Sequence, residues 1–328
     1  MVEIKPLQKN EIEKFYTFNR QAYPERKRYK EIIDFWFSKN PEEYRLTNVL
    51  FVDGKITGQF LHSSMRYYYE GRKNESFWGF DLIIEKEKRK GAYGLDLLQY
   101  NMEQFDSEFA TGSGPLALKI EIALGYKQIG ELKKYINFVN PFFLPLALLR
   151  NKRTVLKYPE EVKFSTNEKF EKVSLDSFSN FTQPFTSNLL EISREKLFIK
   201  WRFYNSLYRY TVYKSAKTNS YFVLRTITKN HILCMVLVDY RCDLNNRNEF
   251  KDIIKAAKEI TWKLMIPILI TGSSLKCIDD ILEENHFKVT GRNRPIISTL
   301  SFKERKDDIE NRNFTLITLA DSDGEILW

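Results

Sequence analysis

The sequence predicts a mixed α/β (α+β) fold made of two consecutive domains, each a mixed, mostly antiparallel sheet flanked by helices. The chain has 328 residues, which at roughly 150 residues per domain favours two domains. Runs of β-branched and aromatic residues alternate with amphipathic helical runs, and from Glu171 onward the same order of elements returns in a weaker form. We therefore expect domains at residues 1–139 and 171–328, joined by a connector at 140–170.

Composition narrows the class of protein. Hydrophobic residues make up 43% of the chain and charged residues 29%, which is typical of a globular protein and excludes a disordered one. The net charge of +9 indicates affinity for phosphate or another anion, without specifying nucleic acid. Three cysteines without metal-ligand spacing predict neither a zinc cluster nor disulfides. Without a signal peptide or a membrane span of ~20 apolar residues, we expect a soluble cytoplasmic protein.

In the first half, local signals predict each element. Phe15, Phe18 and Ala22 recur at helical spacing, Asp53-Gly54 marks a tight hairpin, and Pro115 suits the first turn of a helix. The expected elements are a strand at Val2–Pro6, helices at Asn10–Ala22 and Tyr29–Ser38, strands at Leu46–Val52, Ile56–Tyr69 and Ser76–Ile84, a helix at Gly91–Phe105, a strand at Glu108–Gly112, a helix at Pro115–Leu124 and a strand at Lys127–Phe138.

The second half follows after a connector-like stretch at Asn140–Lys157, which contains two prolines and a basic patch. The expected elements are a helix at Leu189–Trp201, strands at Tyr210–Tyr213, Tyr221–Thr228 and His231–Asp239, a helix at Phe250–Leu264, a strand at Pro267–Thr271, a helix at Leu275–Asn285 and a strand beginning at Lys288–Val289. Two copies of one architecture is the simplest interpretation of this order.

The most informative segment runs from Asp81 to Leu98, where a buried strand ends in a basic, glycine-containing turn that opens directly into a helix. Such a turn directs free backbone N–H groups and the positive end of the helix dipole toward an anion. Its small residues let the backbone approach a ligand closely. The residues of the turn are Arg89, Lys90, Gly91, Ala92, Tyr93 and Gly94. The segment therefore predicts a phosphate-binding site.

This turn, followed by Leu97 and Leu98, resembles the Arg/Gln-x-x-Gly-x-Gly/Ala pyrophosphate loop of the GNAT superfamily, the acyl-CoA-dependent N-acyltransferases. Downstream, Ala117 to Tyr126 (ALKIEIALGY) resembles the Ala-x-x-Leu-Tyr-x-x-Leu-Gly-Phe pattern of the helix that closes the family's acyl-CoA cleft. The hairpin around Asp53-Gly54 is similar to the strands that precede the family's cofactor strand. The resemblance spans nearly all of residues 1–138. It implies tandem GNAT-like domains that use acetyl-CoA or another acyl-CoA.

Two positions depart from the family pattern. Ala92 stands where the family usually has glycine. A negative φ would be tolerated there, whereas a left-handed conformation would cost on the order of 1–2 kcal/mol. Glu121 occupies the place where many members carry a tyrosine that can protonate the departing thiolate of coenzyme A. The resemblance then implies a different general acid, or none.

The resemblance also suggests roles for individual residues. An attacking amine must lose a proton, and Asp81, at a frequently acidic position of the family, is the candidate base, directly or through water. The alternative is a structural carboxylate that bonds a backbone group or a lysine. Glu121 could supply a second carboxylate, but an exposed position on its helix is the favoured interpretation. Backbone N–H groups around Ile83 and Ile84 would hold the pantetheine arm, while their side chains are core. Ser113 would bond that arm or cap the next helix.

The second half resembles a GNAT-like domain less specifically, through Lys200 to Phe203, the strand at His231–Asp239 and the ending Phe314 to Asp323. Residues 239–248 (DYRCDLNNRN) lack the small residues of a pyrophosphate loop. We therefore expect a cofactor site only in the first domain.

Two further groups of side chains are functional candidates. The aromatic run from Trp201 to Tyr210, interleaved with arginines, could stack on bases or sugars, but core packing is the favoured interpretation. The histidines His62, His231 and His286 are scattered, so the sequence predicts no metal site.

The expected function is that of a cytoplasmic, bacterial N-acyltransferase. It would move an acyl group, acetyl in the first instance, to the amine of a small molecule or amino sugar in a cleft between the domains. A second hypothesis is a catalytically degenerate binding module for an anionic partner, which the missing tyrosine supports. A third is an aminoacyl-tRNA-dependent transferase, for which the +9 charge is a mild argument. The chain lacks the long Lys/Glu-rich helical arm that would support it, so a nucleic-acid partner is not favoured. The acceptor and the oligomeric state stay open.

Overall fold

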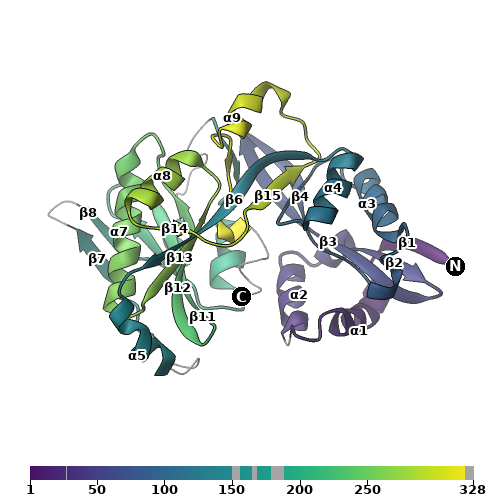
Figure 1. The fold of residues 1–328 in the computed structure, drawn as a ribbon, viewed down its shortest axis with the longest axis horizontal. Helices are drawn as coiled ribbons and strands as arrows, with labels where there is room; N and C mark the ends of the chain where they lie inside the picture. Colours follow the sequence, from purple (N-terminus) through teal and green to yellow (C-terminus); the bar gives the residue numbers. More distant parts are fainter. Residues whose placement is uncertain (27, 150–155, 165–167, 179–187, 322–328) are drawn as a thin grey trace. The chain divides into compact units, whose positions relative to one another are not determined.

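The protein is described here by a computed structural model covering residues 1–26, 28–149, 156–164, 168–178 and 188–321 (Figure 1). The chain forms two compact units. Unit 1 comprises Met1–Tyr67, Lys73–Ile129 and Pro295–Glu304. Unit 2 comprises Tyr68–Arg72, Gly130–Arg294 and the residues that follow Glu304. In both units a mostly antiparallel sheet is flanked by helices, which confirms the predicted fold class.

Unit 1 is built on the strand order β1-β2-β3-β4-β5-β15. Its elements are β1 (Val2–Pro6), α1 (Ile12–Ala22), α2 (Tyr29–Phe37), β2 (Asn48–Val52), β3 (Lys55–Tyr69), β4 (Arg72–Ile84), α3 (Tyr93–Gln104), β5 (Glu108–Thr111), α4 (Pro115–Leu124), the start of β6 (Lys127–Phe138) and β15 (Arg294–Ser298). β4 and β5 pair in parallel, whereas β5 and β15 pair antiparallel. Asp53 and Gly54 have φ angles of 50° and 77°, as a tight hairpin turn between β2 and β3 requires, so the predicted hairpin is confirmed.

Unit 2 has the strand order β6-β13-β12-β11-β10-β8-β7, with β14 also paired to β6. Its elements are α5 (Leu144–Leu149), β7 (Glu161–Phe164), β8 (Glu168–Lys172), β9 (Leu190–Ile192), α6 (Lys196–Ile199), β10 (Thr211–Ser215), β11 (Tyr221–Lys229), β12 (Ile232–Arg241), α7 (Arg247–Lys263), β13 (Ile268–Ser273), α8 (Lys276–Glu284), β14 (Lys288–Val289), α9 (Lys306–Glu310) and β16 (Thr315–Leu316). The central pair β12–β13 is parallel and its neighbours are antiparallel.

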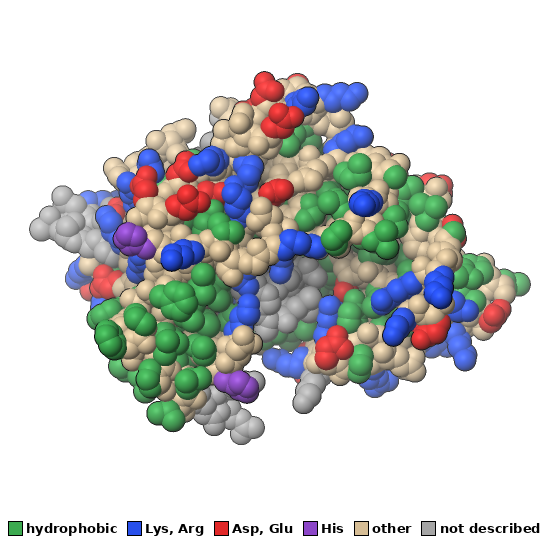
Figure 2. Space-filling model, viewed as in Figure 1, with side chains coloured by type: hydrophobic (Ala, Val, Ile, Leu, Met, Phe, Trp, Pro, Cys, Tyr) green, Lys and Arg blue, Asp and Glu red, His purple; other side chains and the backbone are tan. Residues whose placement is uncertain are grey.

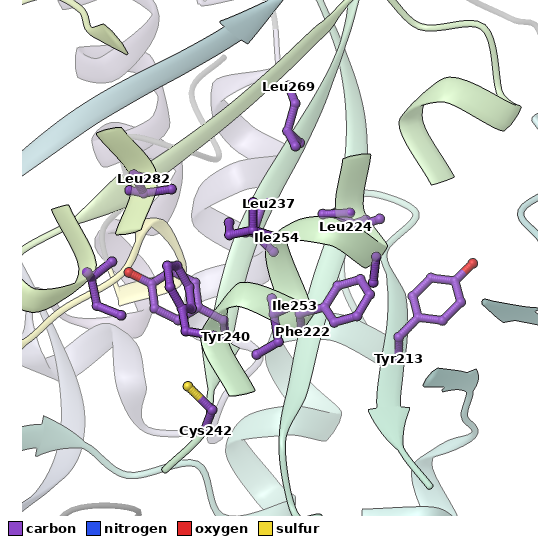
Figure 3. Packing of buried hydrophobic residues seen from close by; sticks show 14 of the residues in the cluster. Tyr213, Phe222, Leu224, Leu237, Tyr240, Cys242, Ile253, Ile254, Leu269 and Leu282 are labelled. Carbon is purple, nitrogen blue, oxygen red and sulfur yellow. The ribbon is translucent and has the colours of Figure 1, made fainter. Parts of the chain in front are cut away.

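The core of unit 2 lies between this sheet and α7. Figure 3 shows Ile253 and Ile254 of α7 packed among Phe222, Leu224 and Leu237 of the neighbouring strands. All five side chains are fully buried. The central strands are apolar along most of their length because both of their faces are covered. This core fixes α7 at the end of β12, the position that α3 takes at the end of β4 in unit 1.

Two segments of the chain lie in a unit that their sequence position does not indicate. Gly130–Phe138 of β6 belongs to unit 2, where Lys133–Phe138 pairs with β13, although it continues a strand that starts in unit 1. Pro295–Glu304 belongs to unit 1, where Ile296 and Ile297 pair with Thr111 and Ala110 of β5. This grouping differs from the expected division after residue 139, because strand pairing joins segments about 190 residues apart.

One expected helix is wrong. Instead of a continuous helix over Leu189–Trp201, the chain forms strand β9, the short helix α6 and a π-helical turn at Lys200–Tyr204. β9 pairs in parallel with β16, whose residues lie far along the sequence, so tertiary pairing overrides the local helical pattern. The expected connector also contains regular structure, including α5 and β7.

No helix among the described residues is both long and apolar enough to cross a membrane.

Candidate active site

The site in unit 1 begins where two parallel strands separate. β4 and β5 pair from Phe77 and Glu108 only as far as Gly79 and Ala110. β4 continues to Ile84, whereas β5 ends at Thr111 and leads into α4. The carboxyl ends of the two strands therefore part, with α3 following one strand and α4 following the other. In α/β sheets, ligands bind beyond the carboxyl ends of parallel strands that diverge in this way.

The end of β4 is firmly anchored in the core. Ile83 and Ile84 are 7% and 8% exposed, and Ile84 packs with Leu97 and Leu98 of α3. Gly58 of β3 lies so close that a Cβ atom there would approach Ile84 Cδ1 to 2.6 Å. The first turn of α3 is thereby held against the strand end, and the side chains of Ile83 and Ile84 are core, as expected.

The basic turn leads directly into α3. Lys90, Gly91 and Ala92 are exposed, and Ala92 has a φ of −75°, so alanine is tolerated where the family pattern has glycine. The first backbone bond of the helix runs from Asp96 N–H to the Ala92 carbonyl. The preceding N–H groups, including those of Tyr93 and Gly94, have no acceptor one helical turn back. The turn thus offers backbone donors and positive charge to an anion.

Arg89 lies across the end of β4. Its Nε donates a 2.8 Å hydrogen bond to the carbonyl of Ile84, while the residue as a whole is exposed. This bond fixes Nε of Arg89 next to the strand end, so the other guanidinium N–H groups are held in a defined position and remain free to bind an anion. Gly94, in the first turn of α3, lies against the same strand end, since a Cβ atom there would contact Ile84 Cγ1 at an ordinary 3.6 Å.

Asp81 is held by side chains from the segment between α1 and α2 and from the start of α2. Oδ1 accepts hydrogen bonds from Tyr23 Oη at 3.0 Å and Arg26 Nη1 at 3.1 Å. Oδ2 accepts from Arg26 and from the Tyr29 hydroxyl, which also accepts from Gln59. The Tyr23 and Tyr29 rings stack with centroids 5.5 Å apart. Among the described residues, Asp81 therefore bonds side chains other than the lysine or backbone group considered above, and sequence reasoning missed these three partners.

Tyr29 and Tyr23 differ in their access to solvent. Tyr29 is only 3% exposed, and burial together with the charge of Asp81 raises the pKa of its hydroxyl well above the usual value. Tyr23 is half-buried. Arg26 stacks over the Tyr23 ring at 3.6 Å from the centroid. Tyr23 and Arg26 are thus the partners of Asp81 that keep some access to solvent.

Glu121 is not exposed on its helix, contrary to expectation: it is 4% exposed, because α4 turns it inward. Its Oε1 accepts a 3.0 Å hydrogen bond from Ser113 Oγ. Burial raises the pKa of the Glu121 carboxyl to about 7; the Ser113 bond opposes the shift and the charge of Glu108 adds to it. Ser113 therefore contacts Glu121, and Gly114 is the residue at the N-cap of α4.

A second buried carboxylate, Glu108, lies behind this position. Its Oε2 accepts hydrogen bonds from Asn101 Nδ2 at 2.6 Å and Tyr126 Oη at 2.9 Å, and His62 Nε2 is 3.4 Å away. A Cβ atom on Gly79 would lie 2.2 Å from the other oxygen, so this approach requires glycine. Gly79 and Asn101 were not singled out from the sequence, and Glu108 was only the first residue of an expected strand.

In unit 2 the corresponding strand end is filled by a buried ion cluster. Asp239 of β12 accepts hydrogen bonds from Arg194 Nε at 2.9 Å, Arg241 Nη1 at 3.0 Å and Thr318 Oγ1 at 2.7 Å. All four residues are fully buried. Although burial opposes it, the charges of Arg194 and Arg241 hold the pKa of Asp239 well below its usual range. Asp321 adds a 2.6 Å ion pair to Arg194.

The start of α7 is also unlike the start of α3. The Asn246 side chain accepts a hydrogen bond from the Asn248 N–H at 3.3 Å and so caps the helix itself. Trp201, Arg202 and Phe203 are buried, which confirms core packing for this part of the aromatic run. No group of three or more metal-ligating side chains occurs within the described part of the chain.

Comparison with known proteins rests on structure alone. No protein-family model and no curated protein matches the sequence significantly. A GCN5-related N-acetyltransferase from Anabaena variabilis superimposes with a TM-score of 0.61 at 14% identity, covering 91% of this chain and 72% of that one. A probable N-acyltransferase from Enterococcus faecalis gives 0.60 at 12% identity, with coverages of 91% and 72%.

A third similar structure is that of Saccharomyces cerevisiae N-myristoyltransferase with bound myristoyl-CoA. Its TM-score is 0.59 at 11% identity, covering 90% of this chain and 82% of that one. The chain therefore has a GNAT-like fold, as its sequence motifs indicated. The match over nine-tenths of the chain is consistent with a tandem arrangement of GNAT-like units.

Proposed function

We propose that this protein is an acyl-CoA-dependent N-acyltransferase whose co-substrate binds in unit 1. The observation that carries the proposal is the parting of β4 and β5 beside the basic turn and the first turn of α3. The pyrophosphate of coenzyme A would bind the N–H groups of Tyr93 and Gly94, with Arg89 and Lys90 as cationic partners. The exposed backbone of Gly91 and Ala92 permits close approach.

The pantetheine arm would run along the backbone of Ile83 and Ile84 toward Ser113, where the strands part. A neutral amine then attacks the thioester carbonyl, the C–N bond forms, and the C–S bond breaks to release the coenzyme A thiolate. Asp81 accepts the proton of the amine through the Tyr23 hydroxyl, which passes its own proton to Oδ1 at 3.0 Å. Glu121, with a carboxyl pKa of about 7, can protonate the thiolate.

The acceptor in this proposal is the amine of a small molecule, and acetyl-CoA is the first donor to test. Isothermal titration calorimetry of the full chain should show one acetyl-CoA per chain. At 100 times its Kd the ligand should stabilise the folded protein by about 2.7 kcal/mol. An amine screen that detects released thiol then tests for transfer.

The outcomes separate the hypotheses. The proposal would be contradicted if the protein bound none of the three ligands acetyl-CoA, a longer acyl-CoA and free CoA. Tight binding without transfer to any amine would favour the degenerate binding module, which the engagement of both Asp81 oxygens also supports.

A further inference from the structure

Helix α4 buries its acidic side chain and exposes apolar ones. Its ten residues, PLALKIEIAL, include two charged side chains, Lys119 and Glu121, and the rest are apolar. Glu121 is 4% exposed, whereas Leu116 is 73% and Ile122 43% exposed. Figure 2 shows apolar side chains at the surface where Figure 1 places α4. Surface helices normally have the reverse arrangement, with an apolar stripe toward the core and charged residues toward water.

The surroundings of Glu121 suit a neutral carboxyl better than a carboxylate. Oε1 accepts the hydrogen bond of Ser113, but Oε2 is buried and has no hydrogen-bond partner among the described residues. The titratable groups that face Glu121 are Glu108 of β5 and Tyr126 of β6, and neither is a cation. α3 and β15 contribute apolar side chains to the cluster against which α4 packs. Since the pKa of the Glu121 carboxyl is about 7, ionisation near neutral pH would leave an uncompensated charge in this position.

A rotation of α4 about its axis would replace this carboxylate with an apolar side chain. Successive residues of an α-helix lie about 100° apart around the axis, so Ile120 and Ile122 flank Glu121. A turn of about this angle in one sense moves each side chain to the place now held by the residue after it. Glu121 then takes the exposed place of Ile122, and Ile120 takes the buried place of Glu121. The opposite turn is unfavourable, because it would carry Lys119 into the half-buried place of Leu118 in an apolar cluster.

The two ends of α4 are suited to such a movement. At the N-cap, Gly114 has open space around it, since a Cβ atom there would meet no atom within 4 Å. At the other end, Gly125 follows the helix with a φ of 115°, a conformation that glycine adopts readily. A few residues at the ends of an element can absorb the backbone changes of a hinge. The helix can therefore turn while β5 and β6 keep their strand pairing.

We propose that α4 is a pH-dependent switch with two orientations, one with Glu121 inward and one with Glu121 outward, in the place that Ile122 now occupies. The inward orientation, which the structure shows, holds a protonated carboxyl. The outward orientation exposes the carboxylate to water and releases Ser113 from Glu121, at the point where β5 leads into α4. This inference concerns α4 by itself and does not depend on the proposed acyltransferase activity.

The direction of the switch follows from the raised pKa. Burial raises the pKa of inward Glu121 to about 7, so the inward orientation is favoured at low pH and is lost as pH rises through this value. In the outward orientation we take the ordinary glutamate pKa of 4.5. The ratio of outward to inward molecules should then rise about tenfold between about pH 6 and pH 8.

Methyl NMR of the full chain distinguishes the two orientations. In the outward orientation Leu116 takes the half-buried place of Ala117, and Leu118 takes the exposed place of Lys119. From pH 6 to pH 8, a soluble gadolinium chelate should therefore relax the Leu116 methyl groups less and the Leu118 methyl groups more. Glu121→Gln cannot ionise and is the control, with the same relaxation expected at both values. Leu197 on α6, 72% exposed, is the internal reference.

Two results would overturn the proposal. If both leucines become more accessible at pH 8, α4 detaches or unfolds and does not rotate. If neither changes, or if Glu121→Gln changes as the wild type does, ionisation of Glu121 does not move the helix. Amide hydrogen exchange of residues 115–124, corrected for the intrinsic effect of pH, checks that the helix stays formed. No acyl-CoA is present in these measurements, so their outcome is separate from that of the acetyl-CoA titration.

Discussion

At the scale of single residues, Asp81 combines an unusual backbone conformation with three side-chain partners. Its φ is +57°, in a region where non-glycine residues are uncommon but asparagine and aspartate are enriched. Asparagine therefore preserves both the backbone and the shape of the side chain while it removes the charge that pairs with Arg26. Asp81→Asn is accordingly a sharper test than Asp81→Ala, which would also strain the strand.

We predict that Asp81→Asn lowers turnover by about 10² to 10⁴ while acetyl-CoA affinity changes little. Steady-state rates and calorimetry measure the two effects separately. Tyr23→Phe removes the proposed relay but leaves the carboxylate and its pairing with Arg26 intact, so a similar loss of rate would identify the route of the proton. Full turnover of Asp81→Asn from about pH 6 to 8 would leave Asp81 with a structural role only.

Glu121 makes folding stability depend on pH. Its pKa in the folded protein, about 7, lies above the ordinary value of 4.5 for a glutamate carboxyl, so Glu121 of the unfolded chain ionises first as pH rises. Below about pH 4.5 the carboxyl is therefore protonated in both states and does not lower the free energy of unfolding. Between about pH 4.5 and pH 7 it lowers this free energy progressively, by about 3 kcal/mol in all. We predict that Glu121→Gln is more stable than the wild type at pH 8 by up to this amount. Urea denaturation at pH 8 and pH 5 measures it, and equal differences at both values would contradict the assignment.

The same substitution should have little effect on catalysis. A coenzyme A thiolate can leave near neutral pH with help from water, so we predict that Glu121→Gln changes turnover by less than tenfold. Stopped-assay rates of the two proteins at matched acetyl-CoA saturation check this. A loss of several orders of magnitude would make the Glu121 carboxyl a required general acid.

Sequence reasoning found the polar residues of the site more readily than their surroundings. The spacing could have shown that Glu121 faces inward, because Leu118 and Leu124, three residues to either side, lie on the same helix face. The partners of Asp81 gave no such signal. Tyr23 and Tyr29 precede it by more than fifty residues, and only tertiary packing brings them to the strand.

At the scale of elements, the sequence predicted the order of strand, turn and helix around the start of α3. A strand, a basic turn and a helix follow one another as the motif implied, and the negative φ of Ala92 accounts for its departure from the family pattern. The expected helix at Leu189–Trp201 shows the limit of this reasoning. Its apolar pattern is real, but Leu190 to Arg194 are buried by contacts with a strand and an ion cluster that lie far away in sequence.

We predict that Gly94→Val and Arg89→Ala each weaken acetyl-CoA binding. A Cβ atom at Gly94 would be at an ordinary van der Waals distance from its nearest neighbour, so the valine variant should fold. Its affinity for acetyl-CoA should fall because the valine side chain prevents the close approach of the ligand to the backbone. Lys14→Ala on α1 controls for the lost charge of Arg89, because Lys14 is exposed and outside the site. Unchanged calorimetric affinity in both variants would remove the basis for the pyrophosphate assignment.

The end of β12 should matter for stability and not for ligand binding. Asp239→Asn would leave Arg194 and Arg241 buried without their main counter-charge, so we predict a loss of about 3–5 kcal/mol in the free energy of unfolding. Denaturant titration measures the loss, and calorimetry should still show one acetyl-CoA per chain. A second ligand in the wild type that disappears in the variant would place a cofactor at β12.

At the scale of the whole molecule, the placement of Gly130–Phe138 in unit 2 and of Pro295–Glu304 in unit 1 determines where the chain can be divided. The sequence showed where the elements repeat, and a cut after residue 139 follows from that repeat. It could not show that Pro295–Glu304 completes the sheet of unit 1, because an isolated apolar strand carries no information about its partner.

We predict that a fragment ending at residue 139 aggregates. It exposes the edge of β5 that Ile296 and Ile297 normally cover, and it carries Gly130–Phe138 without the partner strand β13. Size-exclusion chromatography with light scattering measures its state. A chain of residues 1–129 linked by glycine and serine to residues 295–304 should be monomeric by comparison. If the 1–139 fragment is folded and monomeric, the pairing of β5 with β15 and of β6 with β13 contributes little to the stability of unit 1.

The late position of β15 also bears on synthesis. On the ribosome, β5 emerges long before its antiparallel partner does, because the whole of Gly130–Arg294 is translated in between. At roughly 5–20 residues per second, that interval lasts about 10 to 30 s. During this time the nascent sheet has one open edge, which other nascent chains or a chaperone can occupy. The yield of native protein should therefore depend on how fast this stretch is translated, even though the finished chain contains every contact that it needs.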